Sequence, residues 1–229
     1  MKIIKGIILA IIIIIIGTGL PIIGWGILNI SSFFENPVRL SLIIIIIIQG
    51  IIIGIKSIKG QTENAINKGR NDRYNNIQSL VPIINRLITL FIFFFASYSD
   101  KNNFIVIYDN FLIRLIGIIV YSFGILITVL AHNELGKYHS IEVTIQKDHK
   151  LIQKGPYKYI RNPIYLGVIL STLGYGIIFR SIISIALIVI IIGLFIWRIF
   201  AEEKVMEKEF GKEWSDYRKK TRRLIPYVF

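Results

Sequence analysis

The chain has 229 residues, a mean hydropathy of +0.64 and 54% hydrophobic residues, with long runs of isoleucine. This composition excludes an ordinary water-soluble domain, because several segments approach the roughly 20 apolar residues that cross a hydrocarbon core about 30 Å thick. A formal charge of +13 would favour nucleic acid as the partner of a soluble protein. In a membrane chain the same charge sets the topology instead, so we expect membrane lipids and no nucleic acid as partners.

Two further classes of site are excluded or disfavoured. The chain has no cysteine, which excludes disulfides, thiolate nucleophiles and Cys-ligated metals. Its three histidines, His132, His139 and His149, lack the spacing of metal ligands. They are also too few for a di-iron oxygenase, so we interpret them as loop residues and predict no metal site. Strands are normally shorter than these isoleucine runs, so the fold class is predicted to be an all-α integral membrane protein.

About six segments have the length and composition of transmembrane helices. They lie near residues 7–30, 38–55, 80–98, 112–130, 163–179 and 182–199. The first resembles a signal peptide, because Lys2 and Lys5 precede its apolar run. The run continues past Pro21 without a small-residue cleavage site, so we expect a retained span with a kink at this proline.

The segment that follows the sixth span predicts an amphipathic helix at 201–220, lying on the membrane surface or over the preceding loop. Its apolar side chains recur at helical spacing, at Met206, Phe210, Trp214 and Tyr217. Glu203 falls near the middle of this stripe and Glu202 at its edge. A carboxylate on an inward face is costly unless it is paired. Glu203 is therefore either a site residue or the ion-pair partner of Arg161 or of a lysine.

The densest group of aromatic, cationic and turn residues lies at 155–167. Asn162 is a strong N-cap type and Pro163 suits the first helical position, so the pair is predicted to cap a helix whose free N–H groups favour an anion. Arg161 adds a planar fork for a carboxylate or phosphate. Three tyrosines offer π faces to an alkylated cation, namely Tyr157, Tyr159 and Tyr165. The alternative is a basic juxtamembrane loop without a site.

The fifth span carries small residues at a spacing that lets a neighbouring helix approach closely. These residues are Gly167, Ser171 and Gly174. Simple helix packing is the favoured interpretation of all three.

Basic residues are distributed unevenly between the two sides of a six-span bundle. Both termini, the 56–79 loop and the 131–163 loop fall on one side, which receives most of the basic residues. The opposite side keeps Arg39, Lys101 and Arg180. The positive-inside rule therefore predicts that the N- and C-termini and the site at 155–167 are cytoplasmic.

Taken in order, these motifs resemble the isoprenylcysteine carboxyl methyltransferase family, which belongs with the related phospholipid methyltransferases. The residues that carry the resemblance are Gly155-Pro156-Tyr157-x-Tyr159-x-Arg161-Asn162-Pro163-x-Tyr165-x-Gly167, then Glu202-Glu203, then Phe210-Gly211-x-x-Trp214-x-x-Tyr217. The resemblance covers residues 126–229. It divides the chain into a methyltransferase-like membrane domain at 80–229 and an N-terminal transmembrane hairpin with a cytoplasmic loop at 1–79.

The resemblance implies S-adenosylmethionine as the methyl donor and a lipophilic small molecule or lipidated substrate as the acceptor. The cofactor site would form where the cytoplasmic loop meets the C-terminal amphipathic helix. Carried over by position, its binding residues are Tyr157, Arg161, Asn162, Pro163, Tyr165, Gly167, Glu202 and Glu203. Arg161 and Glu203 are also expected to act in catalysis. A carboxylate acceptor needs no base, whereas an amine would need Glu202 or Glu203 to take its proton.

Two other functions compete with a methyltransferase. Membrane sterol-type reductases, which use NADPH, share a similar tyrosine, Arg-x-Pro and Tyr-x-Gly pattern. A non-catalytic membrane binding module is favoured by Asn162, because the family commonly has histidine at this position. Asparagine caps a helix but does not titrate near neutral pH, so a proton-transfer role of that histidine would be absent here.

The six-span topology predicts that positions 31 and 140 lie on opposite sides of the membrane. Because the chain has no cysteine, single cysteines in place of Ser31 and Ser140 should react with an impermeant maleimide from opposite sides of sealed vesicles. Reaction of both from the same side would contradict the topology.

Overall fold

A computed structural model describes residues 2–58, 78, 80–136 and 151–225 of the chain. The elements are α1 (Lys2–Trp25), η1 (Ile27–Asn29), α2 (Ile30–Phe34), α3 (Pro37–Ile58), α4 (Leu80–Lys101), α5 (Phe111–Leu135), η4 (Gly155–Lys158), α6 (Pro163–Ile178) and α7 (Ile182–Lys220). No strand occurs in this described part, and the predicted all-α class is confirmed. His139, His149 and Ser140 lie outside the described residues. His132 lies in α5 rather than in a loop.

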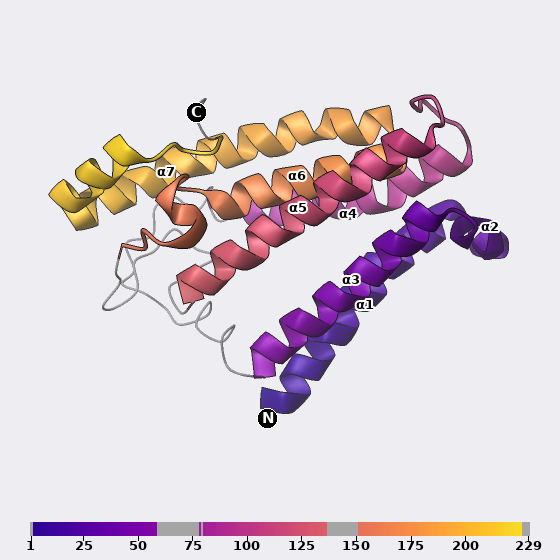
Figure 1. The fold of residues 1–229 in the computed structure, drawn as a ribbon, viewed down its shortest axis with the longest axis horizontal. Coiled ribbons are helices and arrows are strands. Elements are labelled where there is room, and N and C mark those ends of the chain that lie inside the picture. The colour runs from indigo at the N-terminus through magenta and orange to yellow at the C-terminus, as the bar shows by residue number, and fades with distance from the viewer. Residues whose placement is uncertain (1, 59–77, 79, 137–150, 226–229) are drawn as a thin grey trace.

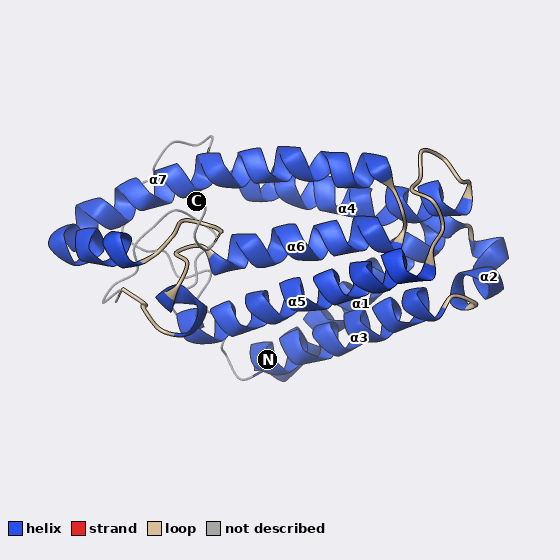
Figure 2. Cartoon of the chain, turned by 45° about the horizontal axis from the view of Figure 1, so that its top comes forward, coloured by secondary structure: helices blue, strands red, loops and turns tan. Residues whose placement is uncertain are grey.

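Among the described residues, five helices are long and apolar enough to cross a membrane, namely α1, α3, α4, α5 and α7. The chain is therefore a multi-pass membrane protein. The predicted fifth span is shorter than expected, because α6 has 16 residues. At 1.5 Å per residue it is about 24 Å long, which is less than a hydrocarbon core of about 30 Å. The helices lie side by side in one elongated bundle (Figures 1 and 2).

Close packing between α5 and α6 depends on glycine. A Cβ atom on Gly124 of α5 would lie 2.4 Å from the backbone nitrogen of Ser171, and one on Gly174 of α6 would lie 2.3 Å from that of Tyr121. Any larger side chain would therefore push the two backbones apart. This confirms that the small residues of the fifth span let a neighbouring helix approach, and it identifies that helix as α5.

Two predicted boundaries are wrong. The first span ends at Trp25 instead of Ile30, because Gly26 adopts a φ of 100° and a short 3₁₀ turn follows. The sixth span and the amphipathic helix are a single helix, α7, with no break near residue 200. The break occurs at Gly211, whose φ of 48° suits glycine. The part of α7 beyond this glycine, yellow in Figure 1, folds back toward η4.

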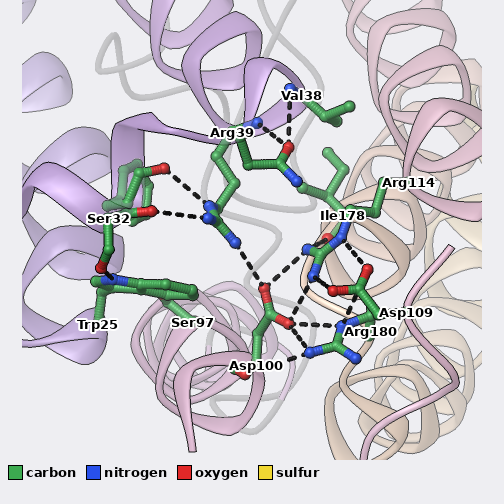
Figure 3. Close-up of polar contacts among 12 residues, drawn as sticks. Trp25, Ser32, Val38, Arg39, Ser97, Asp100, Asp109, Arg114, Ile178 and Arg180 are labelled. Atoms are coloured by element: carbon green, nitrogen blue, oxygen red, sulfur yellow. Dashed lines mark hydrogen bonds and ion pairs between the residues drawn. The ribbon is translucent and has the colours of Figure 1, made fainter. Parts of the chain in front are cut away.

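One end of the bundle is held together by a buried charge network around Asp100, at the end of α4 (Figure 3). Arg114 donates to both carboxylate oxygens of Asp100, at 2.8 and 2.9 Å. Arg180, in the turn between α6 and α7, donates to Oδ1 at 2.6 Å, and Arg39 of α3 donates to Oδ2 at 3.3 Å. Asp109 accepts from Arg114 at 2.8 Å. We call these five residues the Asp100 cluster.

The Asp100 cluster joins α3, α4, α5 and the α6–α7 turn. The Asp100 carboxylate is fully buried, and the arginine side chains are at most 8% exposed. A buried charge is costly unless it is paired and hydrogen-bonded. The cluster therefore holds these four elements in one arrangement, because any displacement would leave a guanidinium or a carboxylate without a partner.

Replacing Asp100 by asparagine should destabilise the protein by about 3 to 5 kcal/mol, since three buried guanidinium groups lose their shared counter-charge. Thermal unfolding of the detergent-solubilised protein measures the loss. Asp109→Asn is the matched control, because the Asp109 side chain is 57% exposed and its loss should cost less. Equal melting temperatures for Asp100→Asn and the wild type would contradict the role of the cluster.

Candidate functional site

At the end of the bundle away from the α6–α7 turn, η4, the start of α6 and the last turns of α7 lie close together (Figure 1). The predicted site residues come from η4, from the start of α6 and from the middle of α7. Pro163 is buried and occupies the first position of α6, as predicted. Asn162 occupies the N-cap position, but its side chain makes no capping hydrogen bond. The helix therefore begins where predicted, but the prediction that the Asn162 side chain caps it is wrong.

The side chain of Asn162 is used instead to hold the C-terminal segment at 221–224. Its Nδ2 donates to the carbonyl of Arg223 at 2.9 Å, and its backbone N–H donates to the same oxygen at 3.1 Å. The Arg161 N–H donates to the Arg222 carbonyl, and the Arg222 N–H donates to the Tyr159 carbonyl. This short parallel pairing is a tertiary contact, and it outweighs the local preference of asparagine for a cap.

Glu203 binds two arginines. Arg161 Nε donates to Oε1 at 2.9 Å, and Arg223 Nε donates to Oε2 at 3.0 Å. Arg161 also donates through Nη1 to the Thr221 carbonyl at 2.7 Å. The ion-pair alternative for Glu203 is thus what the structure contains, and the arginine predicted as its partner is the right one. Arg223 was missed, because it lies beyond the helical pattern that located Glu203.

Glu202 belongs to a second cluster, with Tyr165 and Arg198. The Tyr165 hydroxyl donates to Glu202 Oε1 at 2.7 Å. Arg198 Nε donates to the same Oε1 and to the Tyr165 hydroxyl oxygen, each at 2.8 Å. The Tyr165 ring stacks on Phe195 with 4.5 Å between centroids. Arg198 was not predicted, although it stands one helical turn before Glu202. Its guanidinium also donates to the carbonyl of Gln78 at 3.4 Å, so this residue also lies at the site.

Aromatic side chains from η4 and α7 lie beside these clusters. Tyr217 donates its hydroxyl to the Tyr157 carbonyl at 2.8 Å and contacts the Trp214 ring. Burial raises the pKa of the Tyr157 hydroxyl above its ordinary value, with Tyr217 and Glu202 adding to the effect. Tyr157 is therefore neutral at physiological pH. Tyr159 is 63% exposed and does not share this buried environment.

Gly167 faces α5 rather than the charged clusters. A Cβ atom there would lie 2.1 Å from Thr128 Oγ1 and 2.7 Å from the Gly124 carbonyl oxygen. Its place in the structure is explained by helix packing, and its part in cofactor binding stays a prediction.

The two glutamates differ in what they can still bind. Both oxygens of Glu203 accept from arginine. Glu202 Oε2, in contrast, has no hydrogen-bond or ion-pair partner among the described residues, and this side chain is 26% exposed. Glu202 is therefore the better placed of the two to accept a hydrogen bond from a cationic ligand group.

Comparison with known proteins finds similarity between part of the chain and methyltransferases. Residues 112–213 match the phospholipid methyltransferase family. Protein-S-isoprenylcysteine O-methyltransferase of Schizosaccharomyces pombe is 32% identical over 91 residues, which cover 39% of each protein. The B form of this enzyme in Arabidopsis thaliana is 30% identical over 91 residues, 39% of this chain and 46% of the relative.

A probable enzyme of the same name in Oryza sativa is 26% identical over 127 residues, 52% of this chain and 64% of the relative. The chain thus covers less than two thirds of each of these three relatives. A solved structure of the eukaryotic intramembrane Ras methyltransferase isoprenylcysteine carboxyl methyltransferase is 18% identical, with a TM-score of 0.49 over 96% of this chain and 97% of that one.

The pairing of Glu203 with two arginines predicts a structural cost for its neutralisation. Glu203→Gln should lower the stability by about 1 to 3 kcal/mol, because two largely buried guanidinium groups lose a charged acceptor. Glu207→Gln is the control on the same helix, since that side chain is 59% exposed. Unfolding in detergent compares the two, and equal melting temperatures would show that the Glu203 pairs contribute nothing to stability.

Proposed function

Starting from the relationship of residues 112–213 to the phospholipid methyltransferase family, we propose that this protein is an S-adenosylmethionine-dependent methyltransferase acting on a lipophilic acceptor at the membrane. The observation that carries the proposal is the meeting of the two sequence motifs. Arg161 contacts Glu203 at 2.9 Å and Tyr165 contacts Glu202 at 2.7 Å, across 42 and 37 residues of chain. The two motifs are therefore in contact in the folded chain, which supports a single site.

The residues present fit such a methyl donor. When bound, it supplies an electrophilic methyl group on a sulfonium, next to an amino acid tail and a nucleoside. Glu202 would accept a hydrogen bond from the cationic amino group through Oε2. The rings of Tyr157 and Tyr165 would lie beside the positively charged sulfonium. Arg161 and Pro163 would hold the loop and the helix start, with Asn162 fixing the C-terminal segment over them. Glu203 acts by orienting Arg161.

The length of α6 supports a lipophilic acceptor. One end of this helix is fixed by Arg180 in the Asp100 cluster. A helix of about 24 Å that starts from one membrane boundary ends short of the other, since the hydrocarbon core is about 30 Å thick. The start of α6, where Arg161 and Tyr165 lie, is thus expected at the depth where acyl chains meet headgroups. A lipidated molecule would reach it without leaving the bilayer.

The charge of the site favours an anionic acceptor group. Three arginines, Arg161, Arg198 and Arg223, surround two glutamates, so the two clusters carry an excess positive charge. A carboxylate would be attracted there, whereas the ammonium of an aminophospholipid would be repelled. A carboxylate also has no proton to lose, so no residue needs to act as a base. We therefore propose O-methylation of an isoprenylcysteine-type carboxylate, on the cytoplasmic side.

Calorimetry on the protein in nanodiscs tests the proposal. S-adenosylmethionine and its demethylated product should bind, and NADPH should not. Labelled methyl groups should then appear on a farnesylated cysteine with a free carboxylate, but not on the same compound with an amidated carboxyl group or on phosphatidylethanolamine. Binding of NADPH alone would move the assignment to a reductase. A folded protein that binds none of the three would be a non-catalytic module.

A further inference from the structure

The chain has three tryptophans, and their side chains lie in three different environments. Trp25 donates from Nε1 to the Ser32 hydroxyl at 2.9 Å. Trp197 is 45% exposed on α7. Trp214 is only 4% exposed, and its Nε1 is buried without a hydrogen-bond partner in the part of the chain that the structure describes. Buried polar groups nearly always have a hydrogen-bond partner, so the unpaired N–H of Trp214 is unusual.

The position of Trp214 connects it to the candidate site. It follows the break at Gly211, after which α7 turns back. One turn later, Tyr217 binds the Tyr157 carbonyl at 2.8 Å, and the rings of Trp214 and Tyr217 lie 5.6 Å apart at 56°. All three aromatic side chains are 7% exposed or less. The folded-back turn thus adds a buried aromatic group to η4, immediately before Arg161.

The chemistry of this group restricts its ligand. An indole N–H donates and cannot accept, so the missing partner is a hydrogen-bond acceptor. Buried aromatic rings favour a flat aromatic ligand, because ring pairs gain energy by offset or edge contacts. Leaving the N–H unpaired lowers the stability of the free protein. A bound heteroaromatic ring with an acceptor nitrogen would both accept from the Trp214 N–H and pack against the aromatic rings.

Resting on the proposed function, we infer that Trp214 is a cofactor-binding residue that donates from Nε1 to a ring nitrogen of the adenine base. Tyr217, whose ring contacts that of Trp214, and the buried Tyr157 would add aromatic faces for the base. Trp214 would thus hold the nucleoside end of the cofactor, and Glu202 would hold its amino acid end.

The test compares Trp214→Phe with Trp197→Phe, using calorimetric binding of the demethylated product, S-adenosylhomocysteine. Trp214→Phe should bind about tenfold more weakly, the typical effect of one hydrogen bond to a buried group. Trp197→Phe should bind as the wild type does. Product analogues in which one adenine ring nitrogen at a time is replaced by C–H identify the acceptor. One of them should bind the wild type about tenfold more weakly and bind Trp214→Phe with no further loss.

Unchanged binding by a folded Trp214→Phe protein would overturn the inference. It would also be overturned if every analogue weakened binding to Trp214→Phe as much as it weakened binding to the wild type. A wild-type protein that melts cooperatively but does not bind the product would instead overturn the proposed function. If Trp214→Phe fails to fold, benzothienylalanine in place of Trp214 keeps the bicyclic shape and removes only the N–H. This substitution should leave the melting temperature unchanged or raised and weaken product binding to the same extent.

Discussion

A single buried carboxylate, Asp100, sets the arrangement on which the rest of the bundle depends. It neutralises arginines from three other elements, and both of its oxygens are occupied. Networks of this kind are stable when every member is paired and costly when one is missing. Arg180 sits in the α6–α7 turn, so the network also fixes where α6 ends. In the proposed function, the depth of the candidate site in the bilayer then follows from the length of α6.

The two ends of the bundle use the same residue types for different purposes. Around Asp100 every carboxylate oxygen is bound, and the result is a rigid support. At the site, Glu203 is also fully bound. Within the part of the chain that the structure describes, Glu202 Oε2 and the Trp214 N–H have no partner. Incomplete pairing lowers the stability of the free protein. It is physically reasonable at a place where a ligand supplies the missing donor and acceptor.

Much of the fold was predictable because hydropathy and small-residue spacing act locally. The site motifs were predictable because their residue types are unusual beside apolar helices. The misses are contacts between distant segments. The sequence around Asp100 does not predict its three arginine partners, which lie 61, 14 and 80 residues away along the chain. Asn162 carries a strong local preference, yet pairing with Arg223 overrides it. Arg198 alone had a local signal, its position one turn before Glu202.

The predicted boundary at residue 79 separates regions of sequence resemblance, but physical contacts cross it. Arg39 of α3 is bound to Asp100, and the Ser97 hydroxyl of α4 donates to the Pro21 carbonyl of α1 at 2.6 Å. The division into two domains therefore stays a prediction from sequence. The hairpin of α1 and α3 supplies one of the three arginines that satisfy Asp100. The hairpin thus affects the site indirectly, because it stabilises the network that fixes the C-terminal end of α6.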